Sequence, residues 1–161
     1  MAIDMFLKIE GVDGESADDK HKAEIDVVAF SWGMSQSGSM HIAGGGGTGK
    51  VSVQDMTITK YLDKASTVLM QKCATGKHFP KATLTCRKAG DTPVEYLVVT
   101  MEEVLVTSIS EGGSEHDPER PQENISLNFA KVKVKYTPQD ATGAAGAASE
   151  LGFDIRANKE L

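Results

Sequence analysis

Apolar and polar residues alternate along most of this chain, which is the pattern of strands that bury one face. In IDMFLKI (residues 3–9) the apolar residues at odd positions share one face, whereas Asp4 and Lys8 take the other. In KATLTCRK (81–88) the inward positions are Ala82, Leu84 and Cys86. These segments predict half-buried strands.

The stretch EIDVVAFSWGM (24–34) follows a loop rich in Gly, Asp and Ser and is predicted as a further strand. Its bulky side chains, Val28, Phe30 and Trp32, are expected on the buried face. The small residues between them, Ala29 and Ser31, then lie on the outward face.

Three later segments complete the strand pattern. VSVQDMTITK (51–60) is rich in β-branched residues, and residues 94–110 form one bent strand or two in succession. In NISLNFAKVKVKY (124–136) the apolar positions change parity near Ala130, which predicts a β-bulge that bends the strand.

One helix is predicted around DKASTVLMQKCA (63–74), with Asp63 as its cap and Gly76 as its stop. The polar segment 111–123 contains two prolines and is expected to be a long exposed loop. Residues 139–150 are small and expected to be flexible, before a final strand in GFDIRAN (152–158). Such a strand is free to reach a neighbouring subunit.

Seven or more strands with one short helix predict a mainly β fold, a compact β-barrel or two-sheet sandwich with the helix on its side. The length of 161 residues and the 40% hydrophobic content suit a single domain over residues 1–161.

The charge of the chain limits the classes of partner that it can bind. A formal net charge of -6 argues against binding to nucleic acid, which needs clustered Lys and Arg. No apolar run reaches membrane-spanning length, and the first ten residues, MAIDMFLKIE, are too charged for a signal peptide. We therefore expect a protein that folds in the cytosol.

The stretch AGGGGTGKVS (43–52) matches part of a phosphate-binding loop, because Gly44, Gly49 and Lys50 have the required spacing. That site also needs a following helix and a hydroxyl after the lysine. Here Val51 takes the hydroxyl position and a strand is predicted instead of a helix, so we interpret the segment as a loop between strands.

No catalytic or metal-binding constellation is recognisable, and no cofactor is expected. Glu102 and Glu103 are adjacent on a strand, so they should point to opposite faces. The four histidines lack metal-site spacing, and Cys73 and Cys86 are expected as two buried thiols, with a disulfide bridge between them as the alternative. A stripe of lysines is interpreted as a solvated face, with an anion site as the alternative; it comprises Lys131, Lys133 and Lys135.

Taken in order, several segments resemble the haemolysin-coregulated protein (Hcp) family, the tube subunit of bacterial type VI secretion. They are MAIDMFLKIEGVDGES, IDVVAFSWGMSQSGSMH, GKVSVQDMTITKYLDKAS, GKHFPKATLTCRKAG, VEYLVVTMEEVLVTSIS, ENISLNFAKVKVKY and GFDIRANKE. The match covers nearly the whole chain.

The resemblance implies a protein that works by shape and is not an enzyme. Its copies would form a homo-hexameric ring with a wide pore, and the rings would stack into a tube. A contractile sheath would propel this tube from the cytosol to the outside or into a target cell, beneath a spike of valine-glycine repeat protein. Effector proteins would be carried in the lumen. Because the chain ends at Leu161, we expect the bare tube form without an added toxin domain.

The resemblance also suggests where the contacts lie. Ser31 and Ala29 are the candidates for the lumen wall, because cargo needs a wettable wall of small side chains; an ordinary solvent-facing strand serine is the alternative for Ser31. Loops are the candidates for ring stacking, at Gly47, Thr48, Gly90, Asp91 and Arg156.

Two other classes of function remain open at this point. A monomeric β-barrel that binds a small ligand should have a deep apolar pocket, and an enzyme should have acids or bases with perturbed pKa values.

Overall fold

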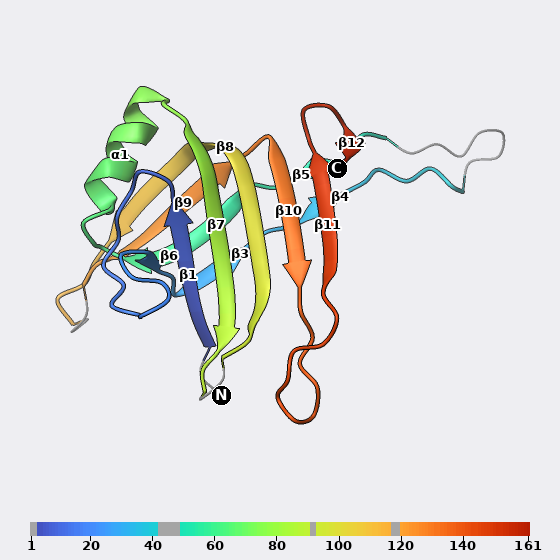
Figure 1. The fold of residues 1–161 in the computed structure, drawn as a ribbon. Coiled ribbons are helices and arrows are strands. Elements are labelled where there is room, and N and C mark those ends of the chain that lie inside the picture. The colour runs from blue at the N-terminus through green and yellow to red at the C-terminus, as the bar shows by residue number, and fades with distance from the viewer. Residues whose placement is uncertain (1–2, 42–48, 91–92, 117–119) are drawn as a thin grey trace.

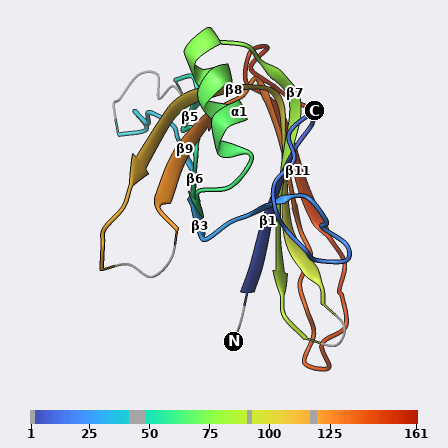
Figure 2. The ribbon, with the colours of Figure 1, turned by 90° about the vertical axis from the view of Figure 1, so that its left-hand side faces the viewer.

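Two antiparallel sheets face each other across an apolar interior, and one helix lies over the side between them (Figures 1 and 2). This is a computed structural model, and it describes residues 3–41, 49–90, 93–116 and 120–161. The predicted two-sheet sandwich with one short helix is confirmed, and the sheets do not close into a barrel.

The first sheet, called sheet A, has the strand order β12-β11-β10-β8-β7-β1-β2. Its strands are β1 Ile3–Ile9, β2 Ile25–Asp26, β7 Phe79–Lys88, the first half of β8 Glu95–Gly112, β10 Lys131–Tyr136, β11 Ser149–Asp154 and β12 Lys159–Glu160. Every pairing between neighbours is antiparallel.

The second sheet, called sheet B, has the order β3-β6-β9-β8. It contains β3 Ala29–Ser31, β6 Met56–Tyr61, β9 Gln122–Asn128 and the second half of β8. A separate ribbon pairs β4 Met34–Ser35 with β5 Ser52–Val53 and runs outward past β11 (Figure 1). The strand at β5 confirms that no helix follows the glycine run.

The 18-residue strand β8 belongs to both sheets. It pairs with β7 and β10 up to Val104, and with β9 from Leu105 onward. Glu103, at the junction, has a φ of 55°, a left-handed conformation that L-residues adopt rarely. Met101 and Val104, which flank Glu102 and Glu103, are both buried in the core, whereas the two glutamates lie away from it. The expectation that Glu102 and Glu103 point to opposite faces is therefore wrong at this bend.

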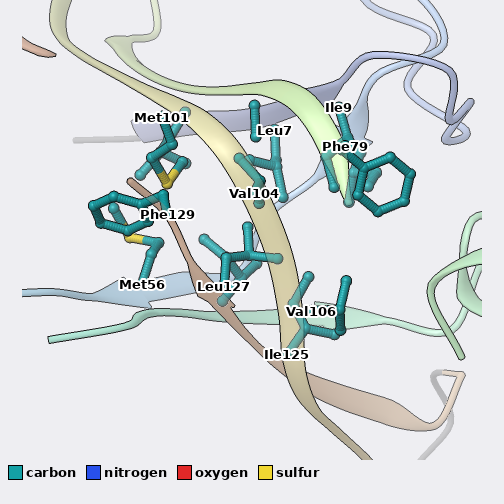
Figure 3. Packing of buried hydrophobic residues seen from close by; sticks show 14 of the residues in the cluster. Leu7, Ile9, Met56, Phe79, Met101, Val104, Val106, Ile125, Leu127 and Phe129 are labelled. Atoms are coloured by element: carbon teal, nitrogen blue, oxygen red, sulfur yellow. The ribbon is translucent and has the colours of Figure 1, made fainter. Parts of the chain in front are cut away.

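The core lies between the sheets and draws on every long strand. The labelled side chains of Met101 and Val104 on β8 and Leu127 on β9 point into one space (Figure 3). Fully buried apolar residues include Leu7, Ile25, Met56, Ile58, Leu69, Ala82, Leu84, Cys86, Met101, Val104, Ile125 and Leu127. The predicted inward face of residues 81–88 is therefore confirmed.

Helix α1 runs over Ser66–Thr75 and packs against β8. The prediction that Asp63 caps the helix is wrong, because the N-cap is Ala65 and it makes no side-chain cap hydrogen bond. Asp63 holds the turn before the helix instead: its Oδ1 accepts a hydrogen bond from the amide of Ala65 at 3.0 Å, and its own amide donates to Ser66 Oγ at 3.0 Å. Gly76 ends the helix with a φ of 70°, where glycine carries no steric penalty.

The predicted strand over 24–34 is broken, because the chain crosses from sheet A to sheet B between β2 and β3. Val27 is buried, whereas Val28 is 42% exposed, so the placement of Val28 on the buried face is wrong. Phe30 and Trp32 are half-buried against the core as expected. Ala29 and Ser31 are exposed.

The parity change near Ala130 has the same origin. β9 belongs to sheet B and β10 to sheet A, so the chain turns a corner at Phe129 and Ala130 instead of forming a bulge within one ladder. This is a correction of the predicted bulge.

The C-terminal segment also differs from the prediction. Within 139–150, Asp140 organises a turn, because its Oδ1 accepts hydrogen bonds from the amides of Thr142 and Ala144 at 2.8 and 3.0 Å. The final strand begins at Ser149 and pairs with β10 of the same chain. Residues 155–158 form a turn instead of strand.

The outer face of sheet A is partly covered by residues 10–24. Phe6 points outward, yet it is only 4% exposed because the ring of His21 stacks on it, with 4.4 Å between centroids. Arg87 lies over the same ring and pairs with Asp18, which lowers the pKa of that carboxyl. The loop is thus fixed to the sheet.

The left-handed conformation at Glu103 can be tested with two substitutions. Glu103→Ala and Glu103→Gly both lose the contact with Arg156, but alanine keeps the steric cost of the positive φ. We expect Glu103→Ala to be less stable than Glu103→Gly by about 1 kcal/mol in urea denaturation. The matched pair at Glu102 should give the opposite order, with glycine less stable by about 0.5–1 kcal/mol. The same order at both positions would contradict the assigned bend.

Candidate functional site

The outer face of sheet B carries two rows of small uncharged side chains that cross all four strands. We call these rows the polar face. Paired backbone positions give the first row as Ser31, Thr57, Ser126 and Ser108, and the second as Ala29, Thr59, Asn124 and Ser110. All eight are exposed or half-buried.

Hydrogen bonds hold parts of this face in place. Thr59 Oγ1 donates to Asn124 Oδ1 at 2.7 Å. Beyond the first row, the carboxylate of Asp55 accepts from Thr107 Oγ1 at 2.7 Å and from Asn128 Nδ2 at 2.9 Å. The face is therefore hydrophilic, and the two rows themselves carry no charge.

Sheet B has two lateral edges, β3 and the second half of β8. Within the described parts of the chain, neither edge is paired with another long strand on its outer side. An unpaired edge presents backbone amides and carbonyls that can pair with another chain. The polar face is thus bounded on both sides by backbone suited to extending the sheet.

The predicted lumen residues, Ala29 and Ser31, both lie on the polar face. The predicted stacking residues do not come together. Gly90 follows β7 beside the start of β8, whereas Arg156 follows β11 at the opposite end of the strands, where it pairs with Glu103. Both are exposed. Gly47, Thr48 and Asp91 lie outside the described residues.

The lysine stripe lies on the outer face of sheet A. Lys131 stands opposite Glu102 and Asp154 on the two neighbouring strands, and Lys135 stands opposite Glu150. Cross-strand pairs of opposite charge are typical of a solvated sheet surface. This arrangement favours the solvated-face interpretation over an anion site.

A second polar cluster lies on the inner side of sheet B, beside helix α1, and the sequence analysis missed it. Lys60, Glu123 and Glu111 occupy one row across β6, β9 and β8. We call them the ionic row. Lys60 and Glu123 are both 0% exposed, and their Nζ and Oε1 atoms lie 3.1 Å apart. Lys60 Nζ also lies 2.8 Å from Asp63 Oδ1 and 3.1 Å from Ser66 Oγ.

The third member of the ionic row has a perturbed acidity. Glu111 lies at the exposed end of the row, and partial desolvation, followed by the hydrogen bond and repulsion from Glu123, raises the pKa of Glu111 to about 7. The sequence did carry a signal for this row, because Lys60 shares parity with the inward residues Met56 and Ile58, and Glu123 shares parity with Ile125. A charged residue at an inward position indicates a buried ion pair.

Other candidate chemistry is sparse. Among the residues that the structure describes, no three His, Cys, Asp or Glu side chains gather as a metal site would require. Cys73 and Cys86 are free thiols, as expected, but only Cys86 is buried, and Cys73 is half-buried. Burial raises the pKa of Cys86 to about 11. In the same part of the chain, no helix is long and apolar enough to cross a membrane.

A surface groove lies between the β4–β5 ribbon and the end of sheet A. Apolar side chains dominate its lining, among them Met34, Val53, Leu151 and Phe153. Met34 and Leu151 are 46% and 41% exposed. The groove is open to the surface, unlike the deep pocket expected of a small-ligand binder, and its lining also includes Gln36, Asn158, Lys159 and Glu160.

The chain was compared with known proteins. Residues 6–136 match the family model described as "Type VI secretion system effector, Hcp". Protein hcp1 of Pseudomonas aeruginosa is 58% identical over 160 residues, covering 98% of each chain. The crystal structure of Hcp1 from Salmonella typhimurium aligns over all of both chains with a TM-score of 0.83 and 43% identity. Another structure, of a type six secretion system protein, aligns over 99% of this chain and 100% of its own, with a TM-score of 0.94 and 33% identity.

The ionic row predicts a large effect of removing its cation. Lys60→Met would leave the buried carboxylates of Glu123 and Asp63 without their partner, and we expect a loss of about 3–5 kcal/mol in the free energy of unfolding. The double variant Lys60→Met with Glu123→Leu should recover part of this loss. Lys133→Met, at an exposed position, serves as the control and should change stability by less than about 0.5 kcal/mol. Equal effects at positions 60 and 133 would contradict the assigned pairing.

Proposed function

The chain belongs to the Hcp family of type VI secretion system effectors, and on that premise we propose that it is the structural tube subunit of such an apparatus. Six copies close into a ring, and rings stack into a tube. The single observation that carries the proposal is the polar face, an uncharged hydrophilic wall bounded by two unpaired strand edges.

Ring closure follows from those two edges. A cyclic assembly needs heterologous contacts, in which one patch meets a different patch on the next copy. β3 and the second half of β8 are two such patches, and pairing between them adds main-chain hydrogen bonds. Repetition around the ring joins the four strands of each copy into a continuous inner wall, with the polar face toward the lumen.

Stacking uses the two ends of the sandwich. Gly90 and Arg156 lie at opposite ends of the strands of sheet A, so one of them faces the ring above and the other faces the ring below. Gly47, Thr48 and Asp91 stay candidates for the same contact. The groove beside the β4–β5 ribbon offers apolar surface to a neighbouring copy.

The remaining partners follow from the tube role. A contractile sheath surrounds the tube, a valine-glycine repeat spike protein caps it, and effector proteins travel in the lumen against Ser31 and Ala29. The protein is cytosolic before firing and is then delivered outside the cell or into a target cell. Shape and hydrogen-bonding capacity perform this work, with no cofactor and no catalytic step.

Disulfide cross-linking tests the edge-to-edge contact. Within one copy, Ser31 and Ser108 are three strand spacings apart, about 14 Å, which is too far for a disulfide. In a Cys73→Ala background, we expect Ser31→Cys combined with Ser108→Cys or with Ser110→Cys to give a ladder of covalent oligomers that ends at six. Electrophoresis without reductant measures the ladder, and electron microscopy should show six-fold rings.

The single variants are the matched controls, because one introduced cysteine per copy, with Cys86 buried, can give nothing beyond a covalent dimer. Double variants that also stop at dimers, although rings are visible, would place the junction elsewhere. Protein that stays monomeric at high concentration would overturn the ring itself.

Accessibility of position 31 tests the lumen assignment. In assembled rings with Cys73→Ala, we expect Ser31→Cys to react readily with a small maleimide. A maleimide on a polyethylene glycol larger than the ring opening should react much more slowly, because the polymer cannot enter the lumen. Lys133→Cys, on the outer face of sheet A, should react readily with both reagents. Equal reactivity of position 31 toward the two reagents would contradict its place on an enclosed wall.

A further inference from the structure

The ionic row contains more acid than base. Lys60 Nζ lies within 3.1 Å of carboxylate oxygens of both Asp63 and Glu123, and it also donates to Ser66 Oγ and to the carbonyl of Tyr61. One cation thus serves two carboxylates. Among the described residues, Glu111 has no cation in salt-bridge contact and shares its place in the row with Glu123.

The strand pairing brings the carboxyl groups of Glu111 and Glu123 onto the same face, where two negative charges would repel each other. They are directly opposite each other on paired strands, so their side chains lie on the same face of sheet B. Glu123 is fully buried, and its Oε1 lies 3.1 Å from Lys60 Nζ. Two negative carboxylates at this separation repel, whereas a protonated Glu111 can donate a hydrogen bond to Glu123.

The position of Glu111 in the fold turns this repulsion into a mechanical effect. Glu111 and Gly112 are the last two residues of β8, and they pair with Glu123 and Gln122. Like charges directly opposite on paired strands destabilise the pairing. The end of a strand is where the fewest hydrogen bonds must break for it to open.

We propose that Glu111 and Glu123 hold one proton between them, and that its release loosens the last residues of β8 from β9, a proton-operated latch at the free edge of sheet B. The latch exists in a single copy of the chain. Only its consequence for assembly, a weaker junction where β8 meets the next copy, rests on the proposed function.

Further charged groups lie on segments next to the ionic row. Arg120 stacks over Tyr61, at the end of β6, and lies 3.6 Å from the carboxylate of Glu15. On the far side, burial raises the pKa of Asp26, with Asp63 adding to the effect. The charged groups that act on Glu111 are Glu123 on β9 and Lys60 on β6, and Asp63 before α1 pairs with Lys60.

The direction of the pH effect follows from the raised pKa. The closed strand end binds the proton more tightly than the open one, because the pKa of Glu111 is about 7 when closed and about 4.5 when solvated. Closure is therefore favoured at low pH. Opening increases by up to about ten-fold per pH unit between these values and levels off above pH 7.

Hydrogen exchange at residues 109–112 and 122–125 tests the latch. Protection factors, corrected for the intrinsic exchange rate at each pH, should fall about ten-fold or more between pH 5 and pH 8 in the unaltered protein. Glu111→Gln keeps a hydrogen-bond donor toward Glu123 at every pH, so its protection should stay constant and match that of the unaltered protein at pH 5. Glu115→Gln, in the neighbouring loop and 87% exposed, is the control and should retain the pH dependence.

Two outcomes would overturn the proposal: protection that does not change with pH in the unaltered protein, or a Glu111→Gln variant that keeps the full pH dependence. A carbon-13 titration of the glutamate carboxyls needs no variant and should show one group titrating near pH 7. Electron microscopy of the same samples separates the two hypotheses. Rings with pH-independent protection would refute the latch alone, and a pH-dependent strand end without rings would refute the ring alone.

Discussion

The bend in β8 is the constraint on which the rest of the fold depends. One strand carries the hydrogen-bond ladders of both sheets, so the angle between the sheets is set where the left-handed Glu103 redirects the backbone. The chain corner at Phe129 and Ala130 follows the same change of direction, because β9 and β10 must each stay beside β8. With the sheets held in this way, their inner faces meet and the core closes between them.

Outside the apolar core, three regions of the sandwich differ in their side-chain chemistry: the two outer faces of the sheets and the inner side of sheet B beside α1. The outer face of sheet A carries charge pairs and a stacked loop, and the outer face of sheet B is small and uncharged. The inner side beside α1 is ionic instead of apolar. Lys60 and Glu123 stabilise the fold little in net terms, because desolvation offsets most of their attraction. Their main effect is on specificity. Lys60 can pair with both Glu123 and Asp63 in only one register of β6 and β9 and one position of the turn before α1.

Period-2 alternation was enough to predict most strands and the inward face of residues 81–88, and the start and stop signals around 63–76 were enough to predict the single helix, because each depends on local sequence alone. The errors occur where the chain changes sheet. The alternation at Val28 and at Ala130 breaks for a reason that lies in another strand. Phe6 could not be placed either, since its burial on the outer face depends on His21 and Arg87.

On the polar face, Ser31 and Ala29 were recognised from their size and parity, whereas their partners Ser126 and Ser108 required knowledge of the strand order. Glu111 lay in a segment interpreted as loop, so its pairing with Glu123 was invisible.

Because of the strand order in sheet A, the resistance of the protein to mechanical unfolding depends on which end of the chain is pulled. β1 lies inside sheet A and is joined to β7 through seven paired positions, so tension applied at that end must shear a whole interior strand at once. β12 lies at the rim and has only two paired positions, and β11 becomes the new rim once β12 is gone. A degradation machine that grips the β12 end therefore peels the sheet one strand at a time, whereas one that grips the β1 end must first break the seven paired positions that join β1 to β7.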